Sequence, residues 1–211
     1  MNVAFYFDPS CPFSWITSRW LLQVSNKRNL QINWQPFSLA LKNDELSGNK
    51  KTKNHSKEHV QSHRMLRIMM AAHSKHGIPL IDSYSASGMI RHILGEPLTD
   101  EAIATVLENM QLPQGLISYA DDESLDAALQ SYIADATRIV GDNIGVPTIV
   151  FTLKNGSQQG YFGPVLTELP SLKESLRLWD SISQLATAPM FFELKRDRGN
   201  THPDTASTAR C

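Results

Sequence analysis

The sequence contains only two cysteines among its 211 residues, Cys11 and Cys211, and they lie at opposite ends of the chain. A small secreted domain held together by disulfides would have more, so that class is excluded. An excess of basic charge is also missing, because 20 lysines and arginines face 21 aspartates and glutamates. Nucleic-acid surfaces and polybasic membrane patches need a strong excess of one sign, and the sequence therefore predicts neither a nucleic-acid nor a membrane partner.

Long hydrophobic runs are absent as well. No apolar stretch approaches the ~20 residues that span a bilayer, and the N-terminus lacks the basic segment and apolar core of a secretory signal. Together with the low cysteine content, these absences predict a cytoplasmic protein. The composition, 41% hydrophobic and 19% charged, is that of a globular protein able to bury a core.

The two ends of the chain carry the strand patterns. Residues 2–7 (NVAFYF) and the alternating residues 30–37 (LQINWQPF) predict two parallel strands, joined by a helix that begins at Pro12. Near the other end, a strand, an Asn-Gly hairpin turn, a returning strand and an amphipathic helix are predicted, at residues 147–152, 155–156, 158–162 and from Pro170.

Between these ends the patterns are helical. A polar stretch after Leu41 is expected to be a loop, and residues 59–77 predict a helix that ends at Gly77. Further helices are expected around residues 83–94, 99–109 and 124–140.

This order of elements resembles a thioredoxin-like α/β fold interrupted by a large all-helical domain. The thioredoxin-like domain would comprise residues 1–40 and 140–196, the helical insertion residues 41–139, and a disordered tail residues 197–211. In that fold a reactive residue follows the first strand and a proline precedes the third. Cys11 and Pro147 stand at these two places.

Cys11 lies in the segment FDPSCPFSW, directly before Pro12. At a helix start, unpaired N–H groups and the helix dipole favour the thiolate, which is the nucleophilic form of cysteine. Ser14, one turn further, can donate a hydrogen bond to that thiolate. In a Cys-x-x-Cys site this position holds the resolving cysteine, so the serine predicts a monothiol site resolved by an external thiol. An inert buried cysteine is the less favoured alternative, because such turns are normally exposed.

The segment Gly145-Val146-Pro147-Thr148 is the predicted second half of the site. In this fold order we expect a cis bond between Val146 and Pro147, although a cis bond occurs in only ~5–6% of X–Pro pairs. The backbone of Val146 would then face the sulfur and bind a thiol peptide as a short added strand. The alternative is an ordinary proline at the start of a strand.

Six blocks carry a resemblance to a known family, namely FDPSCPFSWITSRW, FSLALKN, GVPTIVF, YFGPVL, LRLWD and FFELKR. In this order they resemble the DsbA-like thioredoxin-fold superfamily, and most closely the actinobacterial mycothiol-dependent nitroreductases. The resemblance implies an oxidoreductase that exchanges with mycothiol and reduces nitro compounds or disulfides. It implies no tightly bound cofactor; mycothiol or glutathione would be a co-substrate. A homodimer remains open.

The resemblance also assigns roles to residues. Cys11 matches the nucleophile and Pro147 the cis-proline, and Phe13 and Asn43 match positions near the substrate cleft. Ser14 departs from the best-known members, which have a second cysteine there, so dithiol cycling is not implied. The predicted catalytic residues are Cys11, Ser14 and Pro147, and the predicted thiol- or substrate-binding residues are Pro12, Phe13, Asn43, Val146 and Thr148.

Two other functions stay open. Kappa-class glutathione transferases and 2-hydroxychromene-2-carboxylate isomerases resemble this architecture and carry a Ser-Pro-aromatic-Ser motif, in which a serine binds the glutathione thiolate. Ser14 matches that motif, whereas Cys11 replaces its first serine. The other alternative is a binding module that keeps the fold without turnover.

Two side-chain clusters in the helical region each allow a functional and a purely structural interpretation. His55, His59 and His63 have a spacing that can bind zinc, but a solvated helix face is the favoured interpretation and no metal site is predicted. Met65 and its neighbours are expected in the helix core, with the alternative that they line a substrate cleft. Cys211 is expected to play no part in turnover.

Overall fold

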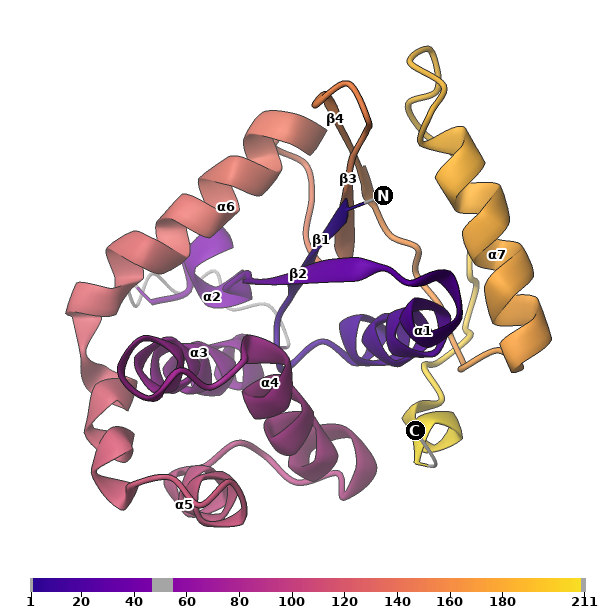
Figure 1. The fold of residues 1–211 in the computed structure, drawn as a ribbon. Helices are drawn as coiled ribbons and strands as arrows, with labels where there is room; N and C mark the ends of the chain where they lie inside the picture. The colour runs from indigo at the N-terminus through magenta and orange to yellow at the C-terminus, as the bar shows by residue number, and fades with distance from the viewer. Residues whose placement is uncertain (1, 47–54, 210–211) are drawn as a thin grey trace.

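The structure is a computed structural model, and it describes residues 2–46 and 55–209. Its sheet has four strands in the order β2-β1-β3-β4. Strand β1 (Asn2–Phe7) pairs in parallel with β2 (Gln31–Pro36) and antiparallel with β3 (Thr148–Thr152), and β4 (Gln158–Phe162) pairs antiparallel with β3. The predicted parallel pair and the predicted hairpin are both confirmed (Figure 1).

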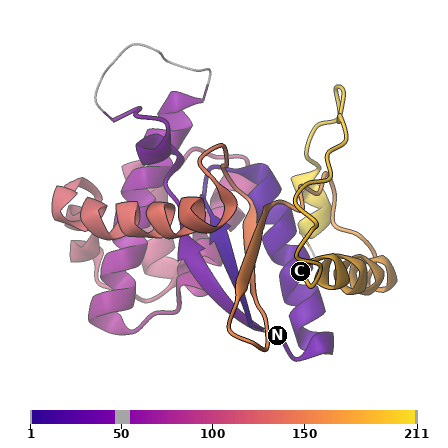
Figure 2. The ribbon, with the colours of Figure 1, turned by 90° about the horizontal axis from the view of Figure 1, so that it is seen from above.

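Helices cover both faces of this sheet (Figures 1 and 2). Phe5 of β1 belongs to the cluster that α1 (Pro12–Arg28) and α7 (Leu172–Leu185) bury, in which the rings of Trp20 and Trp179 lie 6.1 Å apart. Tyr6, the next residue along, belongs to the cluster on the other face, which α6 (Asp126–Val140) covers. The alternation of side chains along a strand produces this division.

The remaining helices pack beside the sheet (Figure 1). They are α2 (Leu39–Lys42), α3 (Ser56–His76), α4 (Leu80–Gly88), the π-helix η1 (Met89–Ile93), α5 (Asp100–Asn109) and the 3₁₀ helices η2 (Gln114–Asp121) and η3 (Glu123–Leu125). Helix α3 ends at Gly77, as predicted, where φ is +68°. The polar segment after Leu41 was predicted to be a loop, and α2 shows that its first residues continue a short helix capped by Ser38.

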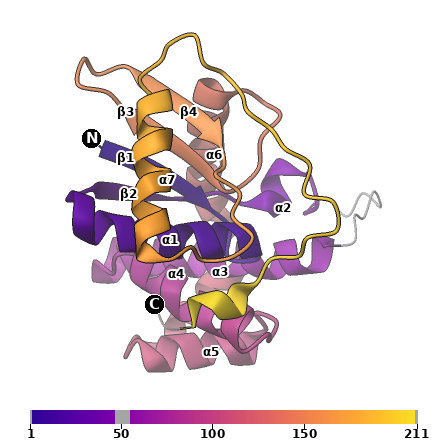
Figure 3. The same cartoon turned by 90° about the vertical axis from the view of Figure 1, so that its right-hand side faces the viewer.

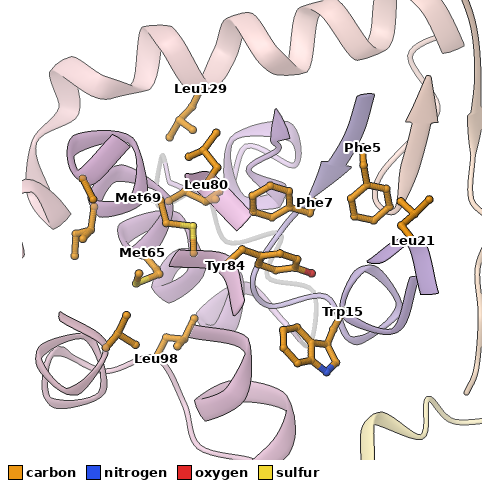
Figure 4. Packing of buried hydrophobic residues seen from close by; sticks show 14 of the residues in the cluster. Phe5, Phe7, Trp15, Leu21, Met65, Met69, Leu80, Tyr84, Leu98 and Leu129 are labelled. Carbon is orange, nitrogen blue, oxygen red and sulfur yellow. The ribbon is translucent and has the colours of Figure 1, made fainter. Parts of the chain in front are cut away.

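One hydrophobic core joins the sheet to these helices (Figure 4). Phe7 of β1 stacks on Tyr84 of α4 at 4.1 Å between ring centroids, and Trp15 of α1 meets the same tyrosine edge-on at 5.9 Å. A β-carbon at Gly88 would lie only 2.1 Å from the Trp15 ring, so no other residue fits there without a shift of the helices. The first turn of α1 therefore packs closely against α4.

The limits of the two predicted domains stay predictions. The packing of α6 bears on the boundary that was placed at residue 139. Helix α6, which the sequence placed in the helical insertion, packs against the sheet through Ile133 and Ala136. In the described part of the chain, no helix is both long and apolar enough to cross a membrane.

The prediction of a disordered tail is wrong for the part of it that ends in η4 (Thr205–Thr208). The indole N–H of Trp15 donates to the Thr208 hydroxyl at 2.8 Å, and the Thr205 hydroxyl donates to the carbonyl of His92 at 2.7 Å. A buried indole N–H needs an acceptor, and the tail supplies it. Cys211 lies outside the described residues.

Candidate active site

Cys11 is the residue that precedes α1, with φ −84° and ψ 112°, and its side chain is partly exposed. Its thiol donates to the carbonyl oxygen of Val146, with 3.5 Å between sulfur and oxygen. The bond between Val146 and Pro147 is cis, as predicted. The fold thus brings together the two predicted halves of the site, which are 135 residues apart in the chain.

Burial raises the pKa of the Cys11 thiol above its ordinary value, and the nearby Asp8 carboxylate raises it further. The N–H groups of Phe13 and Ser14 at the helix start lower the pKa, as predicted, but burial outweighs them. Cys11 belongs to the apolar cluster that includes Val146 and Leu39, and such surroundings penalise a charged sulfur. The resting site therefore holds a neutral thiol that donates to a backbone carbonyl.

Ser14 opposes this effect, because its hydroxyl and its backbone N–H lower the pKa of Cys11. The side chain is completely buried, and its Oγ has no hydrogen-bond partner among the residues that the structure describes. A buried hydroxyl without a partner is uncommon and costs about 1–3 kcal/mol. A sulfur that loses its proton becomes a strong acceptor, and it can then take the hydrogen bond that Ser14 lacks at rest.

A buried carboxylate, Asp8, holds the loop that carries Cys11. Its Oδ1 accepts hydrogen bonds from the N–H of Ser10 at 2.8 Å and from the hydroxyls of Ser10 and Ser62. Its Oδ2 accepts from the N–H of Leu39 at 2.8 Å. One side chain thereby ties the Cys11 loop to α3 and to α2.

The next residue of α3, His63, extends this network. Its Nδ1 lies 2.9 Å from the hydroxyl of Ser38, the cap of α2, and its Nε2 lies 3.1 Å from the Asp126 carboxylate. Arg67 donates to both oxygens of Asp126, at 2.7 and 2.6 Å. Burial lowers the pKa of His63 although Asp126 opposes the shift, so the imidazole is neutral near pH 7.

A second histidine, His92 of η1, contacts the loop of residues 8–10 that precedes Cys11. Its Nε2 donates to the carbonyl of Pro9 at 2.9 Å, and its ring stacks on Trp15 with 5.5 Å between centroids. Burial lowers the pKa of His92 to about 3, so the ring stays neutral and its bond to Pro9 fixes the tautomer. Residues 8–10 are thus held on both sides.

Comparison with known proteins shows the family of this chain. The Rv2466c-like family, described as mycothiol-dependent nitroreductase Rv2466c, matches residues 10–196, which include both halves of the site. The chain belongs to this family. The uncharacterized protein Rv2286c of Mycobacterium tuberculosis is 32% identical over 202 residues, which cover 93% of this chain and 82% of that protein.

Solved structures show the fold of this family member. The cytosolic disulfide reductase DsbM of Pseudomonas aeruginosa aligns with a TM-score of 0.59 at 13% identity, over 88% of this chain and 100% of that one. A 2-hydroxychromene-2-carboxylate isomerase aligns with a TM-score of 0.57 at 17% identity, over 88% of this chain and 96% of that one. The α/β fold with a DsbA-like thioredoxin arrangement is confirmed.

The other predicted site residues have different surroundings. Pro12 opens α1, and the partly buried ring of Phe13 lies under the guanidinium of Arg198. Asn43 is exposed and donates to Glu45 at 3.3 Å. Thr148 is buried and its hydroxyl donates to the carbonyl of Gly145 at 2.8 Å, so it shapes the loop before the cis bond.

Two expectations about α3 need correction. Its histidines do not form one solvated face, because His63 is buried and His59 pairs with Glu45 at 2.7 Å. Met65 and Met69 lie in the core, as predicted, and their burial excludes the alternative that these two line a cleft (Figure 4). Met70, the third methionine of the predicted cluster, is partly buried against the same core. Within the described ranges, no group of three or more histidines, cysteines, aspartates or glutamates is arranged to hold a metal ion.

Replacement of Ser14 by alanine should affect stability and reactivity in opposite directions. The variant loses a buried hydroxyl without a partner, so we expect the free energy of unfolding of the reduced protein to rise by about 1 kcal/mol. It also loses a donor to the thiolate, so the pKa of Cys11 should rise further and its reaction with a small disulfide at pH 7 should slow by roughly 2- to 10-fold. The wild-type rate itself should still be increasing at pH 9, above the ordinary thiol pKa of about 8.5.

Urea unfolding and a pH–rate profile with a chromogenic disulfide measure both effects. A variant that is less stable and equally reactive would show that Ser14 only fills space beneath the helix start.

Proposed function

We propose that this chain is a cytoplasmic monothiol oxidoreductase, in which Cys11 alone exchanges with mycothiol and reduces disulfides or nitro compounds. The observation that carries the proposal is the sulfur of Cys11, a partly exposed residue, 3.5 Å from the carbonyl of Val146, with a serine in place of a second thiol at position 14. The family model that matches residues 10–196 supports mycothiol as the thiol.

The reduction of a disulfide then takes two exchange steps. The thiolate of Cys11 attacks one sulfur of the substrate, a mixed disulfide forms, and the other half leaves as a thiolate that takes up a proton. Mycothiol attacks this mixed disulfide next, which releases Cys11 and leaves the new disulfide between mycothiol and the substrate half. With a nitro compound, two thiols supply two electrons, so that a nitroso compound, water and one disulfide are formed.

The residues around the sulfur have separate roles in this proposal. Ser14 stabilises the thiolate, and the backbone of Val146, set by Pro147 and the loop that Thr148 holds, receives the incoming thiol as an added strand would. In the part of the chain that the structure describes, the N–H of Val146 makes no hydrogen bond. In this proposal Pro12, Phe13 and Asn43 lie at the rim of the substrate cleft. The P. aeruginosa neighbour has also been solved with GSH, a thiol of the same chemical class.

A binding module without turnover is the second candidate, and the raised pKa of Cys11 is the observation that favours it. A thiol that stays protonated near neutral pH reacts slowly. The third candidate, an isomerase or transferase that only binds a thiol, has Ser14 and the fold of the isomerase neighbour in its favour.

A thiol-dependence assay separates the three. A monothiol oxidoreductase should reduce a low-molecular-weight disulfide repeatedly with mycothiol and stop after one equivalent without thiol. A binding module would show no turnover with either mycothiol or glutathione. An enzyme that consumes a thiol adduct without oxidising any thiol would be an isomerase or transferase, and the oxidoreductase proposal would be wrong.

A further inference from the structure

The segment that joins α7 to η4 passes the end of α1 where Cys11 lies. Figure 3 shows it leaving the far end of α7, arching down the outer face and returning beneath α1. It is fastened at both ends, because Tyr161 donates to the carbonyl of Phe191 at 3.2 Å and Asp204 donates through its N–H to the carbonyl of Thr167 at 2.7 Å. We call residues 191–204 the C-terminal strap.

A turn in the strap sets the position of Arg198. The carboxylate of Asp197 accepts from the N–H of Gly199 at 3.0 Å, and the carbonyl of Arg198 accepts from the N–H of Thr201 at 3.1 Å. Gly199 has φ +54°, a conformation that glycine adopts without steric cost.

The guanidinium of Arg198 lies over the ring of Phe13, 4.3 Å from the ring centroid, and Phe13 is two residues beyond Cys11. Within residues 2–46 and 55–209, no carboxylate is within ion-pair distance of this guanidinium. Stacking uses the face of the guanidinium and leaves its N–H groups available at the edge. Those groups match two oxygens of a carboxylate, which is the preferred geometry for arginine.

We propose that Arg198 recognises a carboxylate on the molecule that reacts with Cys11. The proposal rests on the proposed function, since it adds a specificity residue to that site. The carboxylate would belong to the disulfide substrate, because mycothiol, the proposed resolving thiol, carries no carboxyl group. The contact with Phe13 places the positive charge over a side chain of the first turn of α1, the turn that begins directly after Cys11.

Two chromogenic disulfides test this directly. Dianionic 5,5′-dithiobis(2-nitrobenzoate) carries carboxylates, and 4,4′-dithiodipyridine carries none. In each reaction the Cys11 thiolate forms a mixed disulfide with one half and releases the other half as a coloured thiol, so one equivalent is counted per sulfur. The protein should carry Cys211→Ser, so that only one thiol is present.

We expect Arg198→Gln to slow the reaction with the carboxylate reagent about 3- to 10-fold, since charge-assisted hydrogen bonds exceed neutral ones. The same variant should leave the dithiodipyridine rate unchanged, and Arg198→Lys should lie in between. Arg196→Gln is the matched control, since Arg196 is also exposed on the strap, and it should leave both rates unchanged. Added salt should reduce the wild-type preference for the carboxylate reagent.

A second arm locates the carboxylate. The mixed disulfide formed with the neutral reagent is then released with mycothiol, which carries no carboxylate, and Arg198→Gln should release it at the wild-type rate. Equal slowing of both chromogenic reagents in Arg198→Gln, or an equal loss in Arg196→Gln, would overturn the proposal while leaving the redox function intact. Failure of the wild type to react with either reagent would instead refute the proposed function.

Discussion

Replacement of Ser14 by cysteine should turn the monothiol site into a dithiol site. Residues three apart at a helix start are neighbours, within the separation that a disulfide bridges. Ser14 is buried and lies close enough to Cys11 to lower its pKa, so a thiol in its place would face the same sulfur. Oxidation of this variant with mycothiol disulfide should give an internal disulfide and release the small thiol completely.

Intact-mass spectrometry of variants that also carry Cys211→Ser measures the outcome, because oxidised Ser14→Cys would be two hydrogens lighter than its reduced form and carry no adduct. Ser14→Ala is the matched control, and it should retain the small thiol as a mixed disulfide. Retention of the adduct by Ser14→Cys would mean that the side chain at position 14 does not reach the sulfur, and the assigned role of Ser14 would be wrong.

Replacement of Cys11 by serine should abolish thiol-linked reduction, with a loss of at least ~10³-fold, because a hydroxyl neither forms the mixed disulfide nor ionises near neutral pH. Replacement of Cys211 by serine should leave the rate unchanged. The fold should survive both changes, since Cys11 is partly exposed and Cys211 lies in the tail. Steady-state turnover with mycothiol measures the two variants side by side.

An equal loss of turnover in both variants would contradict this assignment. It would make Cys211 the resolving partner of Cys11, with a disulfide between the tail and the site in the oxidised protein. Retained turnover in Cys11→Ser would remove the nucleophile from the mechanism altogether.

Local sequence signals predicted the scaffold of the site well. An apolar strand, a proline at the first helical position and an alternating second strand place Cys11 at the start of α1. The hairpin signal at Asn155-Gly156 places β3 and β4, and with them the Val146–Pro147 bond beside the sulfur. Each of these signals acts within a few residues, where propensity is strong.

The surroundings of the sulfur could not be predicted in the same way. Ser62 reaches Asp8 across 54 positions, and His63 reaches Ser38 across 25, so only the packing of α3 brings these groups together. The Asp-x-Ser pattern at Asp8 and Ser10 is typical of a local turn and hints at one of the bonds. No local sequence signal indicates that the Asp8 carboxylate also accepts hydrogen bonds from α2 and α3.

The pKa of Cys11 also depends on contacts between residues that are distant in the sequence. The helix start is visible in the sequence, but the apolar cluster around the sulfur includes residues from α2 and from the loop before β3, and burial outweighs the hydrogen bonds from Ser14. The tail was misjudged for a related reason. Its polar composition is typical of disorder, whereas the buried indole of Trp15 provides a hydrogen bond that only a folded chain reveals.

The intact mass of the oxidised protein with Cys211→Ser, in which Cys11 is the only thiol, tests the monothiol site most directly. Reduced protein is treated with mycothiol disulfide, freed of reagent, and measured before and after the addition of mycothiol. We predict the added mass of one small thiol, located on Cys11 by peptide mapping, which persists until external thiol is added and then disappears. An adduct that is lost without added thiol, or one that forms at a residue other than Cys11, would contradict the monothiol mechanism.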